Sequence, residues 1–262
     1  MTFPKLHIDT VGSTGQKIVL LHGWGVNSAV FEPLKTALTE YRVHYVDLPG
    51  FGHSPHIDGT IDDWVAALAA QLPQAAIWLG WSLGGLLATK MAIDYPNQVS
   101  GLITVASSPC FMARHDEQPQ PWPGISPQVL SQFSEQLHNN LPKTIERFLA
   151  IQAMGSDTAK SDIQQLKSLL LAKPLADKQS LQQGLSILTE VDLRNQLQHI
   201  QQPWLRIWGR LDGLVPKRLP DMLIKGDNVS DILLHNASHA PFISHSDLFI
   251  TQLEQWIKSI SR

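Results

Sequence analysis

Strand-like and helical patterns of apolar residues alternate along the first part of the chain. Short apolar or alternating runs, each typical of a strand, lie at residues 6–11, 18–21, 43–46, 76–79 and 102–106. Apolar residues at helical spacing lie between these runs, at residues 28–40, 61–72 and 83–95. Such alternation predicts a mostly parallel central sheet flanked by helices, whose ligands bind at the carboxyl ends of the strands.

The alternation stops after Phe111 and resumes near Glu190. Helical patterns in this stretch lie near residues 126–139, 142–154, 156–172 and 177–189, with no evident strand. An all-helical insertion after a strand of a parallel sheet would lie over the strand ends as a lid. Two more strand-like runs and an amphipathic helix follow at residues 204–208, 231–234 and 246–260. We therefore expect an α/β core that comprises residues 1–110 and 191–262. A helical cap, residues 111–190, is expected to be inserted after the sixth strand.

Composition narrows the class of protein. The 262 residues are 43% hydrophobic and 16% charged, which fits one large α/β domain, and the net charge of −3 offers no field that attracts nucleic acid or anionic membranes. No signal-peptide segment is evident, and no apolar run approaches the roughly 18 residues of a membrane span. The single cysteine, Cys110, cannot form an internal disulfide, which agrees with a reducing compartment. We expect a soluble, monomeric, cytoplasmic protein that binds neither nucleic acid nor membranes.

The sequence AIWLGWSLGGLLA, residues 76–88, predicts a strand, a sharp turn and a helix with Ser82 at the turn. A serine in a G-x-S-x-G turn is held in a strained conformation that leaves little room nearby, and Gly80 and Gly84 provide that room. The helix that begins at Leu83 directs backbone N–H groups toward the serine. Because short Gly/Ser patterns also arise by chance, Ser82 is a candidate nucleophile whose role depends on the rest of the chain.

A nucleophilic serine needs a base and an acid that orients the base. Asp212 follows a predicted strand, and His239 lies in the loop after the last predicted strand. The chain order serine, acid, histidine is the one found in G-x-S-x-G hydrolases. Asp212 could instead only form a turn. His235 and His245 are rivals of His239, although His235 lies closer to the strand and His245 lies at the start of the final helix.

The segment HGWG, residues 22–25, directly follows the predicted strand at residues 18–21. The loop after this strand should supply a second oxyanion donor. Its glycines let the backbone approach a substrate, so the amide of Trp24 can pair with the amide of Leu83. His22 fits a residue that braces this loop better than a second base. His53, His56 and Asp58 could suggest a metal site, but they lie in a short polar loop without a helical H-E-x-x-H pattern. We expect no metal and no cofactor.

The motifs HGWG, DLPGFGHS, GWSLGG, GRLDGLVP and SHAPF occur in this order, and over its whole length the chain resembles the α/β-hydrolase superfamily. The segments TVASSPCF, WPGI and ERFLAIQAMG, together with ASHAPFISH, resemble more narrowly the pimeloyl-[acyl-carrier protein] methyl ester esterases of biotin synthesis. The cap motif matters most, because hydrolases of this fold differ in their caps. The resemblance implies the α/β-hydrolase fold with a helical cap.

The resemblance also implies an activity and its residues. The enzyme would hydrolyse the methyl ester of a pimeloyl chain on acyl carrier protein, its partner, with Ser82, Asp212 and His239 as the triad. Trp24 and Leu83 would shape the oxyanion site. The cap segment in contact with the acyl chain would comprise Phe148, Leu149, Ala150, Ile151 and Gln152.

Members of this family grip the acidic carrier with cap arginines, whereas this chain offers Lys143, Arg147 and Lys160, with a neutral Gln164 nearby. Lysine keeps the charge but loses the bidentate geometry of arginine, which predicts weaker carrier binding. From the residues alone, these charges could also be ordinary solvated helix faces. Two other functions stay open at this point, namely a promiscuous short-chain carboxylesterase or another serine hydrolase, and a binding module with a slow triad.

Overall fold

The computed structural model describes residues 2–117 and 120–260, which contain a seven-stranded sheet in the order β1-β3-β2-β4-β5-β6-β7. Only the pairing of β1 with β3 is antiparallel; the other pairs are parallel. The strands are β1 Ile8–Val11, β2 Lys17–Leu21, β3 Arg42–Val46, β4 Ala76–Trp81, β5 Val99–Val105, β6 Trp204–Gly209 and β7 Val229–Leu234. Every residue of β4 and β6 is buried, as expected for strands covered on both faces.

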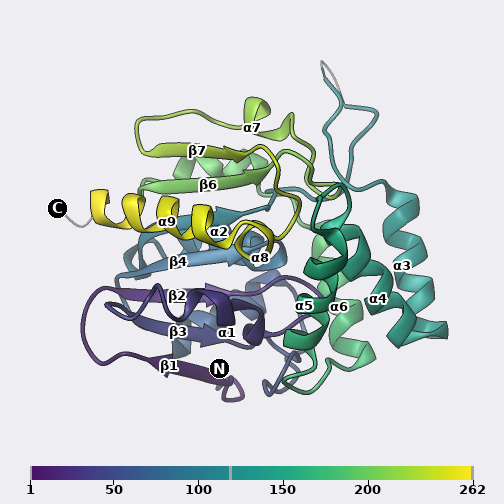
Figure 1. Ribbon diagram of the computed structural model, residues 1–262, viewed down its shortest axis with the longest axis horizontal. Helices are drawn as coiled ribbons and strands as arrows, with labels where there is room; N and C mark the ends of the chain where they lie inside the picture. Colours follow the sequence, from purple (N-terminus) through teal and green to yellow (C-terminus); the bar gives the residue numbers. More distant parts are fainter. Residues whose placement is uncertain (1, 118–119, 261–262) are drawn as a thin grey trace.

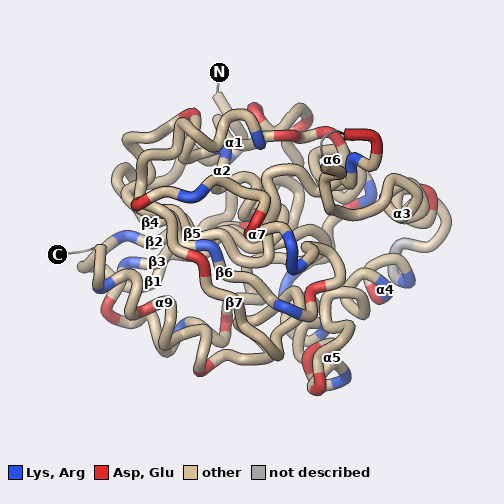
Figure 2. The backbone as a smooth tube through the Cα atoms, turned by 90° about the horizontal axis from the view of Figure 1, so that it is seen from above, with Lys and Arg blue, Asp and Glu red and all other residues tan. Residues whose placement is uncertain are grey.

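Helices cover both faces of the sheet, as the alternating pattern predicts. Viewed from above in Figure 2, α1 Ile61–Gln71 and α2 Leu83–Asp94 lie on one side of the strands and α9 Ser246–Ile260 lies on the other. The N-terminus of α1 is fixed by a capping box. The side chain of Asp63 accepts a hydrogen bond from the amide of Thr60, and the side chain of Thr60 accepts one from the amide of Asp63. The described residues also form two short helices, α7 Leu219–Met222 and α8 Pro241–Ser244, and the 3₁₀ helices η2 Pro96–Gln98 and η3 Arg194–His199.

The helix expected over residues 28–40 is a 3₁₀ helix instead, η1 Ser28–Leu34, followed by turns. Asn27 caps its start by accepting a hydrogen bond from the amide of Ala29. Pro33 lies inside it and has no N–H to donate, so a regular α-helix cannot continue through this position. The apolar side chains still reach the core, and Val30, Phe31 and Leu34 are buried.

Four helices follow β5 in the described residues and match the predicted cap: α3 Pro127–Asn139, α4 Leu141–Ala153, α5 Ala159–Leu170 and α6 Lys178–Glu190. They lie together at one end of the strands (Figure 1). The expectation that the insertion follows the sixth strand is wrong, because only three described strands precede β4 and the cap follows the fifth. The division into core and cap at residues 110 and 191 stays a prediction. None of the described helices has the length and apolar character needed to cross a membrane.

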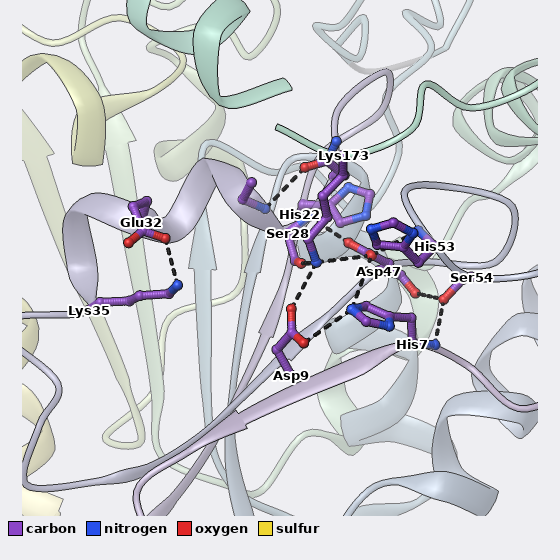
Figure 3. Close-up of polar contacts among 12 residues, drawn as sticks. His7, Asp9, His22, Ser28, Glu32, Lys35, Asp47, His53, Ser54 and Lys173 are labelled. Atoms are coloured by element: carbon purple, nitrogen blue, oxygen red, sulfur yellow. Dashed lines mark hydrogen bonds and ion pairs between the residues drawn. The ribbon is translucent and has the colours of Figure 1, made fainter. Parts of the chain in front are cut away.

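The loop between α5 and α6 is fixed to the core by Lys173. Its ammonium group lies 3.1 Å from Oδ2 of Asp47, 2.9 Å from Oδ2 of Asp9 and 2.8 Å from Oγ of Ser28 (Figure 3). Asp47 follows β3 directly and its side chain is fully buried. This buried ion pair therefore joins the cap sequence to the strand end that borders the site described below.

Candidate active site

The turn between β4 and α2 holds Ser82 in the conformation that its motif predicts. Its φ of 55° and ψ of −118° lie in a region that costs an ordinary residue of order 1–3 kcal/mol. A Cβ on Gly80 would lie 2.1 Å from the carbonyl oxygen of Gly84, and one on Gly84 would lie 2.2 Å from that of Leu21. Only glycine fits at these two positions, which explains why the sharp turn needs both.

The structure brings Ser82, His239 and Asp212 into one chain of hydrogen bonds. Oγ of Ser82 lies 2.9 Å from Nε2 of His239, and Nδ1 of His239 lies 2.8 Å from Oδ2 of Asp212. Asp212 follows β6 and His239 follows β7, so both loops reach the edge of the sheet where β4 presents the serine. The carboxylate accepts a hydrogen bond from Nδ1–H, which leaves the unprotonated Nε2 free to accept a hydrogen bond from the hydroxyl of Ser82.

The two rival histidines lie elsewhere. His235 is exposed in the turn after β7, where its carbonyl accepts a hydrogen bond from Nε of Arg210. The ring of His245 contacts the hydroxyl of Ser244 at 2.8 Å. His239 is the histidine that bonds both Ser82 and Asp212, and its side chain is completely buried.

The HGWG loop, which is predicted to supply the second oxyanion donor, packs against Ser82. A Cβ on Gly23 would lie 3.2 Å from the Cβ of Ser82, so the loop needs glycine to pack against the serine. The amides of Trp24 and Leu83 donate to no acceptor among the described residues, and the Leu83 amide belongs to the free first turn of α2. Both amides are therefore available to a ligand, and their role as an oxyanion hole stays a prediction.

The site is closed and largely apolar. Ser82 is 3% exposed, and Trp24 is fully buried beneath the cap. The ring of Trp24 packs edge-on against Phe148 of α4 at 4.6 Å between centroids and against Phe133 of α3 at 6.4 Å. The indole N–H of Trp24 donates to the carbonyl of Leu181 in α6 at 2.8 Å. Water is largely excluded here, so electrostatic interactions inside the site are strengthened.

The predicted acyl-contacting segment of α4 presents only part of its length inward. Phe148, Leu149 and Gln152 are buried, Ile151 is partly buried and Ala150 is exposed, as the helical period requires. The side-chain Oε1 of Gln152 is buried and has no partner among the described residues. These positions are consistent with a substrate segment on one face of α4, and a substrate contact at each residue stays a prediction.

The predicted carrier-contacting residues lie on the outer surface of the cap. Lys143 and Arg147 are exposed one turn apart on α4, and Lys160 is exposed on α5. Arg147 donates to Oε1 of Gln136 at 3.0 Å, and it helps to line a cavity of about 590 Å³ with Lys143 and the end of α3. Figure 2 shows acidic residues beside the basic ones on α4 and α5, and Glu146 pairs with Lys167 at 2.5 Å.

His22 braces the oxyanion loop, as the sequence predicts. Its Nδ1 contacts the carbonyl of Gly23 at 2.7 Å, and its Nε2 accepts a hydrogen bond from the amide of Leu48 at 3.0 Å. Accepting at Nε2 requires a neutral ring with its proton on Nδ1, and burial lowers the pKa of His22 to about 4. Burial raises the pKa of the adjacent Asp47, but its interactions with His22 and with the amides of His53 and Ser28 outweigh this effect. The pKa of Asp47 therefore lies below its usual value.

No group of three or more metal-ligating side chains that could hold an ion occurs in residues 2–117 and 120–260. In the loop singled out for its histidines, the amide of His53 donates to Asp47 and the ring of His56 contacts the hydroxyl of Ser180 in α6 at 2.9 Å. His56 therefore connects this core loop to the cap, whereas His53 is bonded within the core.

Sequence reasoning missed the groups that fix the backbone of His239. The indole N–H of Trp81 donates to the carbonyl of His239 at 2.7 Å, and the carbonyl of Gln152 accepts from the amide of His239 at 3.0 Å. Trp81 directly precedes Ser82 in the sequence, but no local pattern there indicates a contact with His239. A buried tryptophan usually finds a partner for its N–H, which was the one available signal.

Comparisons with known proteins agree with this geometry. Residues 17–246 match the family model described as alpha/beta hydrolase fold. The pimeloyl-[acyl-carrier protein] methyl ester esterase of Shewanella woodyi is 64% identical over 97% of this chain and 98% of its own length. The protein of the same name from Shewanella sp. (strain MR-7) is 63% identical over 97% of this chain and 95% of its own length.

A solved esterase from Exiguobacterium antarcticum shares the fold at a TM-score of 0.82 and 23% identity, covering 97% of this chain and 95% of that chain. One assignment follows from the fold, from the arrangement around Ser82 and from the sequence identity of 63–64% over nearly the whole chain. The chain belongs to the α/β hydrolase family and, within it, to the family of pimeloyl-[acyl-carrier protein] methyl ester esterases.

Proposed function

We propose that the protein hydrolyses the methyl ester of a pimeloyl chain carried on acyl carrier protein, releasing methanol and the free carboxylate within biotin synthesis. The observation that carries this proposal is the hydrogen-bonded chain from Ser82 through His239 to Asp212, with spacings of 2.9 and 2.8 Å, beneath an apolar cap. Relatives at 64% and 63% identity that bear this name support the choice of substrate.

The proposed reaction has two steps. In the first, Nε2 of His239 takes the proton of Ser82 while Oγ attacks the ester carbonyl carbon, and the amides of Trp24 and Leu83 stabilise the negative oxygen. The tetrahedral intermediate collapses, and His239 returns the proton to the methoxy oxygen, which leaves as methanol. In the second step, a water molecule loses a proton to His239 and attacks the acyl-enzyme. The product leaves as a free acid and Ser82 regains its proton.

The apolar lining favours a second set of substrates as well. Trp24, Phe133 and Phe148 offer aromatic surface to an acyl chain but few polar groups that would reject a shorter one. An apolar pocket distinguishes chains by only about 1–3 kcal/mol per methylene. We therefore propose side activity on short-chain carboxylic esters.

Mass spectrometry of the carrier-bound methyl ester, incubated with the protein in H₂¹⁸O, tests the proposed function. We expect the acyl carrier to lose one methylene unit and to gain one ¹⁸O, because water resolves an acyl-enzyme whose methoxy oxygen has left with methanol. Cleavage of the thioester would instead release the free carrier thiol. An unchanged mass, or release of the thiol alone, would contradict the proposed reaction.

We also propose that Lys143, Arg147 and Lys160 contact the acidic carrier. Charge reversal in Lys143→Glu or Arg147→Glu is expected to raise KM for the carrier-bound ester by about two- to tenfold, because an exposed attraction becomes a repulsion. KM for p-nitrophenyl acetate should not change, since this ester needs no docking surface. Lys5→Glu, an equal charge change at another exposed position, is the control. Equal effects of all three variants on both substrates would rule out carrier docking on α4.

A further inference from the structure

The peptide backbone of His239 is fixed from two sides. Its N–H donates to the carbonyl of Gln152 at the end of α4, at 3.0 Å. Its carbonyl accepts from the indole N–H of Trp81, the last residue of β4, at 2.7 Å. This distance is at the short end of the range for an N–H···O hydrogen bond. The loop that carries the histidine is thus held by the sheet on one side and by the cap on the other.

Trp81 is well suited to act as a rigid reference point. It lies on β4, which is paired with β2 and β5 in the middle of the sheet, and its side chain is fully buried. Its ring packs edge-on against Phe242 at 5.0 Å and lies 5.8 Å from the ring of His239. A Cβ on Gly23 would lie 3.2 Å from its ring, so the oxyanion loop packs on the same tryptophan. One side chain therefore touches the histidine loop and the oxyanion loop, and it directly precedes Ser82.

We infer that Trp81 is a positioning residue, whose indole N–H sets the place of the His239 peptide and thereby the alignment of Nε2 with Oγ of Ser82. This inference rests on the proposed function. A loop peptide without this anchor can rotate, and Nε2 then moves away from the 2.9 Å contact with Ser82 that proton transfer requires. The bond fixes geometry and takes no part in the chemistry itself.

The same strand offers a matched control. Trp78 also lies on β4, is fully buried and donates its indole N–H to a backbone carbonyl, that of Gln98, at 3.2 Å. Replacement of either tryptophan with phenylalanine keeps an aromatic ring, removes one donor and leaves one buried carbonyl without its partner. A purely structural role predicts similar consequences for both variants, whereas a positioning role predicts a difference in catalysis.

The experiment compares Trp81→Phe with Trp78→Phe and wild type, through Tm and through kcat and KM for p-nitrophenyl acetate. We expect the Tm of both variants to fall by a similar amount. Trp81→Phe alone should lower kcat by about tenfold or more, because small misplacements of a catalytic group are costly, with KM changed less than twofold. The rate of Ser82 phosphonylation by a fluorophosphonate should fall by the same factor, since this reaction also needs the aligned histidine.

Each outcome has a distinct meaning. Equal kcat values and equal phosphonylation rates in the two variants would overturn the positioning role while leaving the proposed function intact. Lack of Ser82-dependent hydrolysis by wild type would overturn the proposed function instead. If Trp81→Phe does not fold, β-(3-benzothienyl)alanine at position 81 keeps the shape of the indole and replaces its N–H with sulfur. Wild-type kcat in that variant would equally overturn the inference.

Discussion

Ser82→Ala is expected to lower kcat for ester hydrolysis by about 10⁴- to 10⁶-fold, since the variant lacks the nucleophile and leaves His239 with no hydroxyl to activate. The residual rate would come from the oxyanion donors and the closed site acting on water. The change removes one oxygen from a residue that is 3% exposed and keeps the turn glycines, so the fold should persist. Steady-state hydrolysis of p-nitrophenyl acetate measures the effect.

Ser54→Ala is the control for this variant. Ser54 is also a buried serine, 8% exposed, and its hydroxyl donates to the carbonyl of Asp47 away from the triad. We expect Ser54→Ala to keep kcat within about twofold of wild type and to lose some stability, as a buried hydrogen bond is worth about 1 kcal/mol. Retention of most of the wild-type kcat in Ser82→Ala would refute nucleophilic catalysis by Ser82. It would also exclude the acyl-enzyme route.

Asp212→Asn is expected to lower kcat by about 10⁴-fold through the wrong tautomer of His239. Oδ1 of Asp212 accepts from the amides of Leu214 and Val215 at 2.8 and 3.0 Å. An asparagine must keep its oxygen on these two donors, so its NH₂ group faces Nδ1 of His239 in place of Oδ2. Nδ1 must then accept a hydrogen bond, the ring proton moves to Nε2, and the histidine cannot deprotonate Ser82.

The pH profile of kcat in Asp212→Asn and a matched variant check this prediction. Asp162→Asn changes another buried carboxylate, which accepts from the hydroxyls of Ser156 and Thr158 in the cap, and should leave kcat near the wild-type value. The double variant Ser82→Ala/Asp212→Asn should be no slower than Ser82→Ala, because the three residues act as a unit. An Asp212→Asn enzyme within tenfold of wild type would show that the carboxylate does not set the tautomer.

The closed site gives the cap two roles in this scheme. Phe148 supplies part of the apolar lining, and the carbonyl of Gln152 holds the amide of His239. Helix α4 therefore takes part in both the apolar packing above Ser82 and the placement of His239. A binding module with a slow triad would need no such coupling, and the effects expected for Ser82 and Asp212 would separate a true hydrolase from it.

Local rules anticipated the four cap helices to within a few residues, because helical periodicity and capping depend on neighbours in the sequence. The same rules failed over residues 28–40, where Pro33 and tertiary packing favoured a short 3₁₀ helix.

The sequence by itself determined the sharp turn at Ser82, since only glycine fits beside it, and the alternation of strands and helices that places the loops of Ser82, Asp212 and His239 at one edge of a parallel sheet. Position in the sequence favoured His239 as the partner of Ser82, but tertiary structure alone decided which groups hold that histidine in place. The hydrogen bonds concerned join residues 157 and 158 positions apart, so no local pattern encodes them. They exist because the parallel pairing from β4 through β5 and β6 to β7 brings the ends of β4 and β7 to the same edge of the sheet, and strand pairing over this distance is a property of the whole fold.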